Sequence, residues 1–282
     1  MRICRTKADV RDAVKDFRAK GETVGLVPTM GYLHNGHMSL VSVAKAATSR
    51  VVATIFVNPT QFGDAADLDA YPRDEARDFA LLEAAGVDAV FVPSVTEMYH
   101  ANKQTTVETE QLANILMGAL RPNHYKGVCT VVSKLFNIVQ PDKAFFGEKD
   151  YQQLLVIQTM VRDLDIPVDA IGVPTVRDVD GLALSSRNVR LTADDRQAAL
   201  ILNKALAYGD YEASDGREAA ELERDIHAFI AREPRATVQS VDVRDAFTLE
   251  VPVGKIDSPV VILLAASFGD VLLIDQRVSD PS

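Results

Sequence analysis

The sequence predicts an α/β protein: a doubly wound, Rossmann-like parallel sheet followed by a smaller C-terminal α+β domain. From residue 1 to residue 175, short apolar runs alternate with amphipathic helical segments. The run 50–57 is almost continuously apolar, as expected of a strand buried on both faces of a parallel sheet. After residue 175 the pattern changes to two long helical stretches and then strand-like runs. We therefore expect a first domain at 1–175 and a second, lid-like domain at 176–282.

Each element follows from local periodicity and from the residues that end it. Helices are expected where apolar residues recur three or four positions apart, and strands where β-branched residues cluster before Gly or Pro. In the first domain we expect helices at 9–20, 36–47, 74–85, 127–139 and 151–164, and strands at 23–27, 50–57, 88–92, 143–146 and 168–173. In the second domain we expect helices at 193–207 and 217–232, and strands at 238–243, 260–266 and 271–274.

Composition narrows the class of protein. The chain is 47% hydrophobic, has a net charge of −10, and contains no apolar run that could span a bilayer. An acidic protein of this kind argues against a general nucleic-acid surface and leaves a localised anion site possible. The two cysteines form no metal-type cluster, and the N-terminus lacks a secretory apolar core. We expect a cytoplasmic, reduced protein with no membrane or nucleic-acid partner.

The stretch 28–40 carries most of the functional signal. The strand expected at 23–27 leads into a glycine-containing turn, and a helix is expected from Gly36. Because the first N–H groups of a helix have no partner within it, such a turn can bind an anion. His34 and His37 are three residues apart, so they share one face near the helix start. We interpret this stretch as a phosphate site with two imidazoles beside it.

Other interpretations of these residues remain open. The spacing of Gly31 and Gly36 is that of a Walker A loop, but the Lys and Ser/Thr that complete such a loop are missing. The histidine pair could bind zinc, although no further ligand is evident nearby. In a purely structural alternative, one histidine caps the helix and the other packs in the core. The glycines and the preceding strand favour a ligand site over this alternative.

Polar residues also follow other expected strand ends. In the block 55–62, Pro59 ends a strand and leaves Asn58 and Gln61 beyond it, where an amide could bind a hydroxy acid. An Asn-Pro turn without a ligand is the alternative. The block 118–128 is a loop whose cationic groups could neutralise phosphates or could form a solvated turn; they are Arg121, His124 and Lys126.

Two later blocks add further candidate groups. In 146–153, a strand again meets a glycine turn and a helix, with Lys149 as a mobile cation. Asp150 could cap that helix, or it could hold a ribose hydroxyl or a metal. In 184–188, two serines and an arginine near the expected domain junction would suit a triphosphate and a closing loop.

These blocks together resemble a known family. The core His34-Asn35-Gly36-His37 is similar to the His-x-Gly-His signature of the adenylate-forming nucleotidyltransferases. The longer string from Pro28 to His37 resembles the pantoate–β-alanine ligase family in particular, and the resemblance extends from about residue 23 to residue 191. The family usually has Gly and Phe where this chain has Asn123 and Tyr125, which leaves local loop geometry open.

The resemblance implies an ATP-dependent, AMP-forming ligase that joins pantoate to β-alanine through a pantoyl adenylate. It also implies Mg²⁺ with the ATP, and a homodimer. His37 matches the residue assigned as proton donor, with His34 and Lys149 as further catalytic groups. Gln61 would bind pantoate and β-alanine, and Gln153 would bind pantoate. The implied ATP-binding residues are Met30, Gly31, Tyr32, Leu33, His34, Asn35, Gly36, His37, Gly147, Glu148, Lys149, Asp150, Val176, Leu184, Ser185, Ser186 and Arg187.

Two rival functions stay open at this point. A related nucleotidyltransferase with another acceptor would keep both histidines, but it would give no reason for the blocks around Gln61 and Gln153. A non-catalytic nucleotide-binding protein of the same fold is the second rival, and the intact histidines, Lys149 and Arg187 argue against it.

Overall fold

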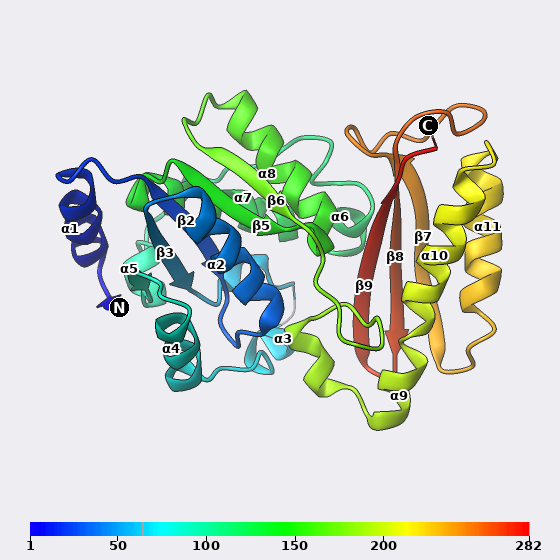
Figure 1. Ribbon diagram of the computed structural model, residues 1–282, viewed down its shortest axis with the longest axis horizontal. Helices are drawn as coiled ribbons and strands as arrows, with labels where there is room; N and C mark the ends of the chain where they lie inside the picture. Colours follow the sequence, from blue (N-terminus) through cyan, green and yellow to red (C-terminus); the bar gives the residue numbers. More distant parts are fainter. Residues whose placement is uncertain (64, 282) are drawn as a thin grey trace. The chain divides into compact units, whose positions relative to one another are not determined.

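The computed structural model describes residues 1–63 and 65–281, which form two compact units (Figure 1). The first unit comprises Met1–Gly147 and Gln152–Pro174, and the second comprises Glu148–Tyr151 and Thr175–Ser282. Each unit has its own hydrophobic core. The domain ranges and the lid role expected from the sequence stay predictions.

The first unit is built on a six-stranded parallel sheet with the order β1-β4-β3-β2-β5-β6. This confirms the predicted doubly wound α/β fold. From β2 the chain proceeds outward through β3 and β4, whereas β5 and β6 lie on the other side of β2. Ligands of such sheets bind at this switch point, beyond the carboxyl ends of the strands. The strands are β1 (Arg2–Cys4), β2 (Val24–Thr29), β3 (Arg50–Ile55), β4 (Ala89–Phe91), β5 (Lys143–Gly147) and β6 (Asp169–Val173).

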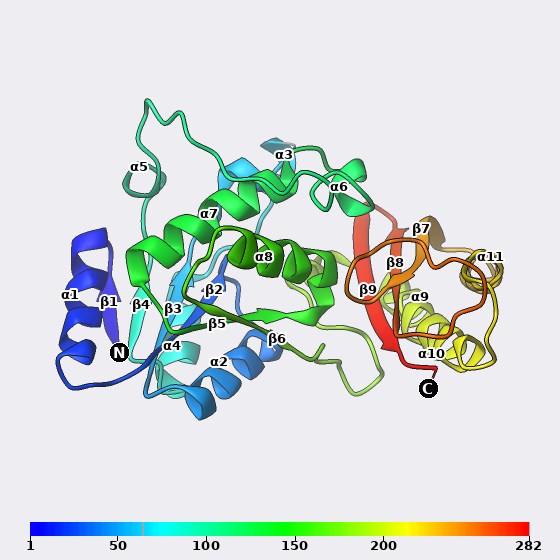
Figure 2. The same ribbon diagram turned by 90° about the horizontal axis from the view of Figure 1, so that it is seen from above.

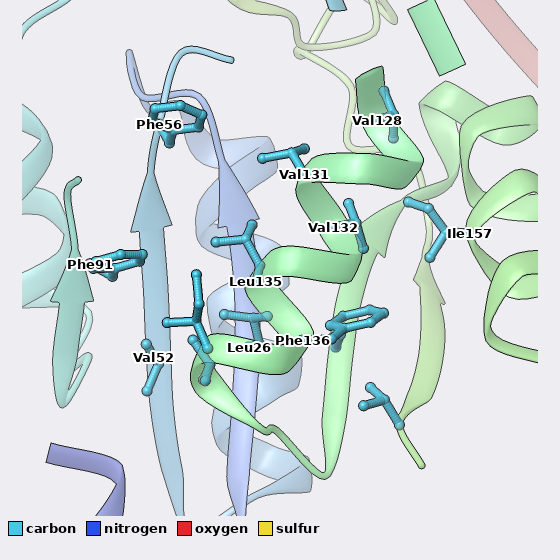
Figure 3. Close-up of a cluster of buried hydrophobic side chains, with 14 of the residues drawn as sticks. Leu26, Val52, Phe56, Phe91, Val128, Val131, Val132, Leu135, Phe136 and Ile157 are labelled. Atoms are coloured by element: carbon cyan, nitrogen blue, oxygen red, sulfur yellow. The ribbon is translucent and has the colours of Figure 1, made fainter. Parts of the chain in front are cut away.

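Helices cover both faces of this sheet (Figure 2). Neighbouring residues of β2 point to opposite faces, so Leu26 and Val27 belong to different core clusters. On the face of Leu26, α7 contributes apolar side chains such as Val132 and Leu135, as Figure 3 shows. One face carries α1 (Lys7–Arg18), α7 (His124–Val139) and α8 (Tyr151–Asp163); the other carries α2 (Asn35–Ala47) and α4 (Glu75–Ala84).

The second unit is a three-stranded antiparallel sheet packed against helices. Gly209 of α10 allows close packing, because a Cβ there would lie 2.6 Å from Ile226 Cδ1 and 2.8 Å from Ile262 Cδ1. The elements are β7 (Ala236–Asp245), β8 (Val260–Phe268), β9 (Val271–Ser279), α9 (Ala193–Ala198), α10 (Ile201–Ala213) and α11 (Ala219–Ile230).

Most expected elements lie within a few residues of the observed ones, but one expectation was wrong. The single helix expected at 193–207 is two helices, α9 and α10. Between them the backbone tightens, because the amide of Leu202 bonds to the carbonyl of Ala199. Several short elements were not expected from the sequence: β1, α3 (Ala65–Asp69), α5 (Val95–Met98), α6 (Met117–Leu120), and the 3-10 helices Pro59–Gln61, Glu148–Asp150 and Ser186–Arg190.

Gln152, at the start of α8, ties the long connection before α7 to the core of the first unit. The residue is only 4% exposed. Its Nε2 donates to the carbonyls of Leu112, at 2.9 Å, and Ile115, at 2.8 Å. Its Oε1 accepts from the amide of Met117 and the hydroxyl of Tyr125, both at 3.1 Å. This one side chain therefore uses two donor and two acceptor positions.

The substitution Gln152→Leu tests this anchor. Leucine is of similar size but leaves four polar groups without their partner, and an unsatisfied buried group costs about 1–3 kcal/mol. We expect the free energy of unfolding to fall by about 3 kcal/mol or more, measured by urea denaturation. In the control Gln158→Leu, one bond within the described residues is lost, that from Nε2 to the carbonyl of Ala170. Equal losses in the two variants would contradict the anchoring role.

Candidate active site

Strand β2 leads the 28–40 stretch to the carboxyl edge of the sheet, beside β5 at the switch point. The hydroxyl of Thr29 donates to the carbonyl of Thr54 on β3, at 2.6 Å, and accepts from the amide of Gly31 at 3.2 Å. Gly31 and Tyr32 then adopt φ values of +83° and +51°. Glycine tolerates this left-handed region, whereas a tyrosine adopts it at a cost. The result is a tight turn between β2 and α2.

Asp78, which was not among the site residues expected from the sequence, holds this turn from α4. Its carboxylate accepts from the amides of Tyr32 and Leu33, both at 2.7 Å. The residue is 1% exposed, and the guanidinium of Arg77 lies over the Tyr32 ring, 5.3 Å from its centroid. One local signal could have found it: Asp78 is four residues before Leu82, so the two lie on the same buried side of the helix.

His34 and His37 cap α2 together. Nδ1 of His34 accepts from the amide of Gly36 at 3.1 Å, and Nδ1 of His37 accepts from the amide of His34 at 3.3 Å. This is a capping box in which two imidazoles take the places usually held by Ser or Thr and Glu or Gln. The ring centroids are 4.1 Å apart. The two rings therefore lie together, as their spacing predicts.

The caps fix the chemistry of the other ring nitrogens. In a neutral imidazole one nitrogen accepts and the other carries the proton. Because both Nδ1 atoms accept backbone N–H groups, Nε2 of each neutral ring carries the proton and can donate. The caps use Nδ1 of each ring and do not involve Nε2. Two N–H donors beside the positive end of a helix suit an anion that has several oxygens.

Gln61 ends the 3-10 helix Pro59–Gln61, and a buried network orients its amide. Nδ2 of Asn58 donates to Gln61 Oε1 at 3.0 Å, and the hydroxyl of Tyr99 donates to Asn58 Oδ1 at 2.8 Å. Asn58 is 1% exposed. Because Asn58 occupies the oxygen, Gln61 presents its Nε2 as a donor. The sequence placed both amides at a strand end, but it could not reveal that one orients the other.

Gly127 in α7 lets this helix approach the Gln61 backbone. A Cβ at Gly127 would lie 2.5 Å from the carbonyl oxygen of Thr60 and 2.7 Å from the amide nitrogen of Gln61. Nδ2 of Asn58 also donates to the Gly127 carbonyl at 3.2 Å. The block 118–128 therefore supports Gln61 directly through its glycine.

The cationic groups of the 118–128 block have partners within the first unit. Arg121 lies 3.6 Å from Asp67, and Lys126 lies 3.3 Å from Glu108. Nδ1 of His124 lies 2.8 Å from the carbonyl oxygen of Gln61. These pairings agree better with a structural role for the block than with a set of cations reserved for phosphates.

Gly147 and Gln153 flank the junction of β5 and α8. Gly147 ends β5, which adjoins β2 at the switch point. Gln153 is half-buried, and its side-chain amide makes no hydrogen bond with the residues that the structure describes. Its neighbour Gln152, by contrast, has both ends of its amide engaged. Of the two side-chain amides, only that of Gln152 is therefore engaged by the residues that the structure describes.

Lys149 and its neighbours belong to the second unit, where their 3-10 helix packs beside β9. Lys149 is largely buried, and its Nζ lies 3.8 Å from the carboxylate of Asp150, which is half exposed. Partial burial raises the pKa of Glu148. The hydroxyl of Tyr151 donates to the carbonyl of Ala246 at 2.8 Å, which fixes the segment to this unit.

Val176 and Leu184 face each other across a hairpin in the second unit. The amide of Leu184 bonds to the carbonyl of Val176 at 3.0 Å. Arg177 anchors this hairpin through two bonds to the buried carboxylate of Asp275, at 2.6 and 2.9 Å. Ser185 then caps the next 3-10 helix, because its Oγ accepts from the amide of Arg187 at 3.2 Å. The expected residues from Val176 to Arg187 thus form one connected segment.

Among residues 1–63 and 65–281, no group of three His, Cys, Asp or Glu side chains could hold a metal ion. Within the same residues, no helix has the length and apolar character needed to span a bilayer.

The chain is similar to known proteins over nearly its whole length. The family model described as Pantoate-beta-alanine ligase matches residues 2–278. A pantothenate synthetase of Sinorhizobium medicae is 53% identical, with 100% of this chain and 97% of that protein aligned. The crystal structure of a pantothenate synthetase from Thermus thermophilus has a TM-score of 0.92 at 45% identity, covering 98% of this chain and 99% of that one. A pantoate-beta-alanine ligase from Francisella tularensis, complexed with beta-gamma ATP and beta-alanine, has a TM-score of 0.82 at 34% identity and 100% coverage of both chains. The chain therefore belongs to the pantoate-β-alanine ligase family.

Proposed function

We propose that this chain uses ATP to activate pantoate and then joins the pantoyl group to β-alanine. The observation that carries the proposal is the histidine capping box at the carboxyl end of β2, in which Nδ1 of both rings accepts a backbone amide at the start of α2. The Francisella tularensis relative was crystallised with an ATP compound and beta-alanine, which supports the same two ligands here.

The chemistry requires two steps. A carboxylate is a poor acyl donor, because the amine of β-alanine would have to displace oxide. In the first step a pantoate carboxylate oxygen attacks the α-phosphorus of ATP, the α–β phosphoanhydride bond breaks, and pyrophosphate leaves. In the second step the amine attacks the acyl carbon, AMP leaves with the bonding electrons, and the nitrogen loses a proton. Pantothenate, AMP and pyrophosphate are the products.

The histidines would act on the phosphates. As the α-phosphorus is attacked, charge builds on its oxygens, and Nε2–H donors held by backbone caps need little reorganisation to bind that charge. We propose that His37 and His34 are catalytic in this sense, together with Lys149. The residues proposed to bind ATP are Met30 to His37, Gly147 to Asp150, Val176 and Leu184 to Arg187.

The two glutamines would bind the acid substrate. Gln61 presents an amide N–H₂ group because Asn58 occupies its oxygen, and an N–H donor suits a carboxylate or hydroxyl. We propose that Gln61 binds pantoate and β-alanine and that Gln153 binds pantoate.

Mg²⁺ is proposed to accompany ATP. The described residues offer no three-ligand cluster of their own, which fits a Mg²⁺ ion held mainly by phosphate oxygens and water. When bound, the ion would neutralise part of the triphosphate charge.

The wider setting of the enzyme is proposed from composition and family resemblance. Cys4 and Cys129 are both free and buried, which agrees with a compartment that keeps thiols reduced. Burial also raises the pKa of the Cys129 thiol to about 11. We propose a cytoplasmic homodimer without a nucleic-acid or membrane partner.

Pyrophosphate exchange tests the proposed step order. Because adenylation needs only pantoate and ATP, the enzyme should exchange labelled pyrophosphate into ATP when β-alanine is absent. Adding β-alanine should then release AMP and an amide. The variant His37→Ala serves as the control and should lower exchange by about 10²-fold, the scale of one lost transition-state donor. Exchange that strictly required β-alanine would refute the adenylate-first order.

The substitution Gln61→Glu tests the pantoate site. A glutamate keeps the acceptor that Asn58 binds, but it replaces the N–H₂ donor with a negatively charged oxygen. We expect the KM for pantoate to rise on the order of tenfold or more, with the KM for ATP nearly unchanged. Gln153→Glu should behave alike, whereas the control Gln158→Glu on the same helix should not. Equal losses for pantoate and ATP would show that Gln61 is only structural.

A further inference from the structure

Asp78 is not among the site residues expected from the sequence, yet its carboxylate bonds to the turn between β2 and α2. Each carboxylate oxygen accepts one hydrogen bond. Oδ2 accepts from the amide of Tyr32 and Oδ1 from the amide of Leu33, each at 2.7 Å. These short, charge-assisted bonds are stronger than ordinary amide bonds. Together they join α4 to the turn at two successive residues.

The turn has a conformation that needs such support. Gly31 has φ +83° and Tyr32 has φ +51°, and the second value is costly for a residue with a Cβ. The space is also limited, because a Cβ at Gly31 would lie 3.0 Å from Asp78 Oδ2 and 3.0 Å from a methyl carbon of Ile55. Without a partner for the two amides, the left-handed turn would have to relax.

The position of Asp78 itself is firmly held. It lies in the first turn of α4, where the side chain of Asp74 caps the helix and the Asp78 amide bonds to the Asp74 carbonyl. One turn later, Leu82 packs into the same core cluster as Leu33 and Val27. Nη1 of Arg77 lies 4.0 Å from Oδ1 of Asp78, which is too long for a hydrogen bond. A buried carboxylate in this setting depends mainly on the two amides, and they depend on it.

We propose that Asp78 is a positioning residue for the nucleotide. By fixing the amides of Tyr32 and Leu33, it sets the direction in which the chain enters α2. That direction places His34 where its Nδ1 can cap the helix and its Nε2–H can meet phosphate oxygens. Asp78 also occupies these two amides, so that neither of them is offered to the phosphates. The inference rests on the proposed function of the histidine pair.

The variant Asp78→Asn tests this role. An asparagine can accept with only one oxygen, and its N–H₂ group would face an amide donor. We expect the KM for ATP to rise about tenfold or more while the KM for β-alanine stays within about twofold. We also expect faster amide hydrogen exchange in peptides that cover residues 30–36, and unchanged exchange in those that cover β3. An unchanged KM for ATP, or unchanged exchange at 30–36, would overturn the proposal.

Asp142→Asn is the matched control. Asp142 Oδ2 also accepts a backbone amide, that of Val24 at 2.6 Å, but at the opposite end of β2. This variant should lower thermal stability without a selective rise in the KM for ATP. If Asp78→Asn also lowered thermal stability without a selective rise in the KM for ATP, the role of Asp78 would be only structural.

Hydrogen exchange in the ligand-free wild type covers the case in which Asp78→Asn does not fold. The amides of Tyr32 and Leu33 should be protected, and exchange as fast as in an unstructured peptide would contradict the inference. This readout does not require activity. A wild type with protected amides but no pyrophosphate exchange would therefore refute the proposed function. The hydrogen bonds from Tyr32 and Leu33 to Asp78 would still be confirmed.

Discussion

The structure of the candidate site depends on one reciprocal interaction, the pair of backbone hydrogen bonds accepted by His34 and His37. Each imidazole uses Nδ1 to satisfy an N–H group that the start of α2 would otherwise leave unpaired. The same bonds fix the tautomer of both rings. A structural requirement of the helix therefore decides which nitrogen of each ring can serve as a donor. The neighbouring strands and helices serve to bring this capping box to the switch point of the sheet.

The fold could be predicted from the sequence where the hydrophobic period is long and clear. The strand at 50–57 and the helix at 127–139 are examples, and both were found within a few residues of their observed limits. The elements that were not predicted are short or depend on contacts with other parts of the fold. The three residues of β1 form a strand only because β4 lies beside them, and the break at Ala199 leaves the apolar period of 193–207 almost intact.

The same distinction holds for the site: contacts between residues close in sequence could be predicted, and contacts between distant residues could not. The histidines are close in sequence, so spacing alone predicts that they lie together. The residues that orient the site are distant in the chain: Asp78 is 46 positions from Tyr32, and Tyr99 is 41 positions from Asn58. A single sequence shows no pairing between such positions. Hydrogen-bond geometry was therefore required to distinguish the anchored amide of Gln152 from the available one of Gln153.

The protonation state of the two rings is the most direct test of this account. Nitrogen-15 NMR of histidine-labelled protein can assign the tautomer of each of the five histidines. We predict that His34 and His37 carry their proton on Nε2, and that ATP with Mg²⁺ shifts their Nε2 resonances more than their Nδ1 resonances. A proton on Nδ1 of either ring, or resonances that saturating ATP leaves unchanged, would contradict the claim that the capping box presents both imidazoles to the phosphates.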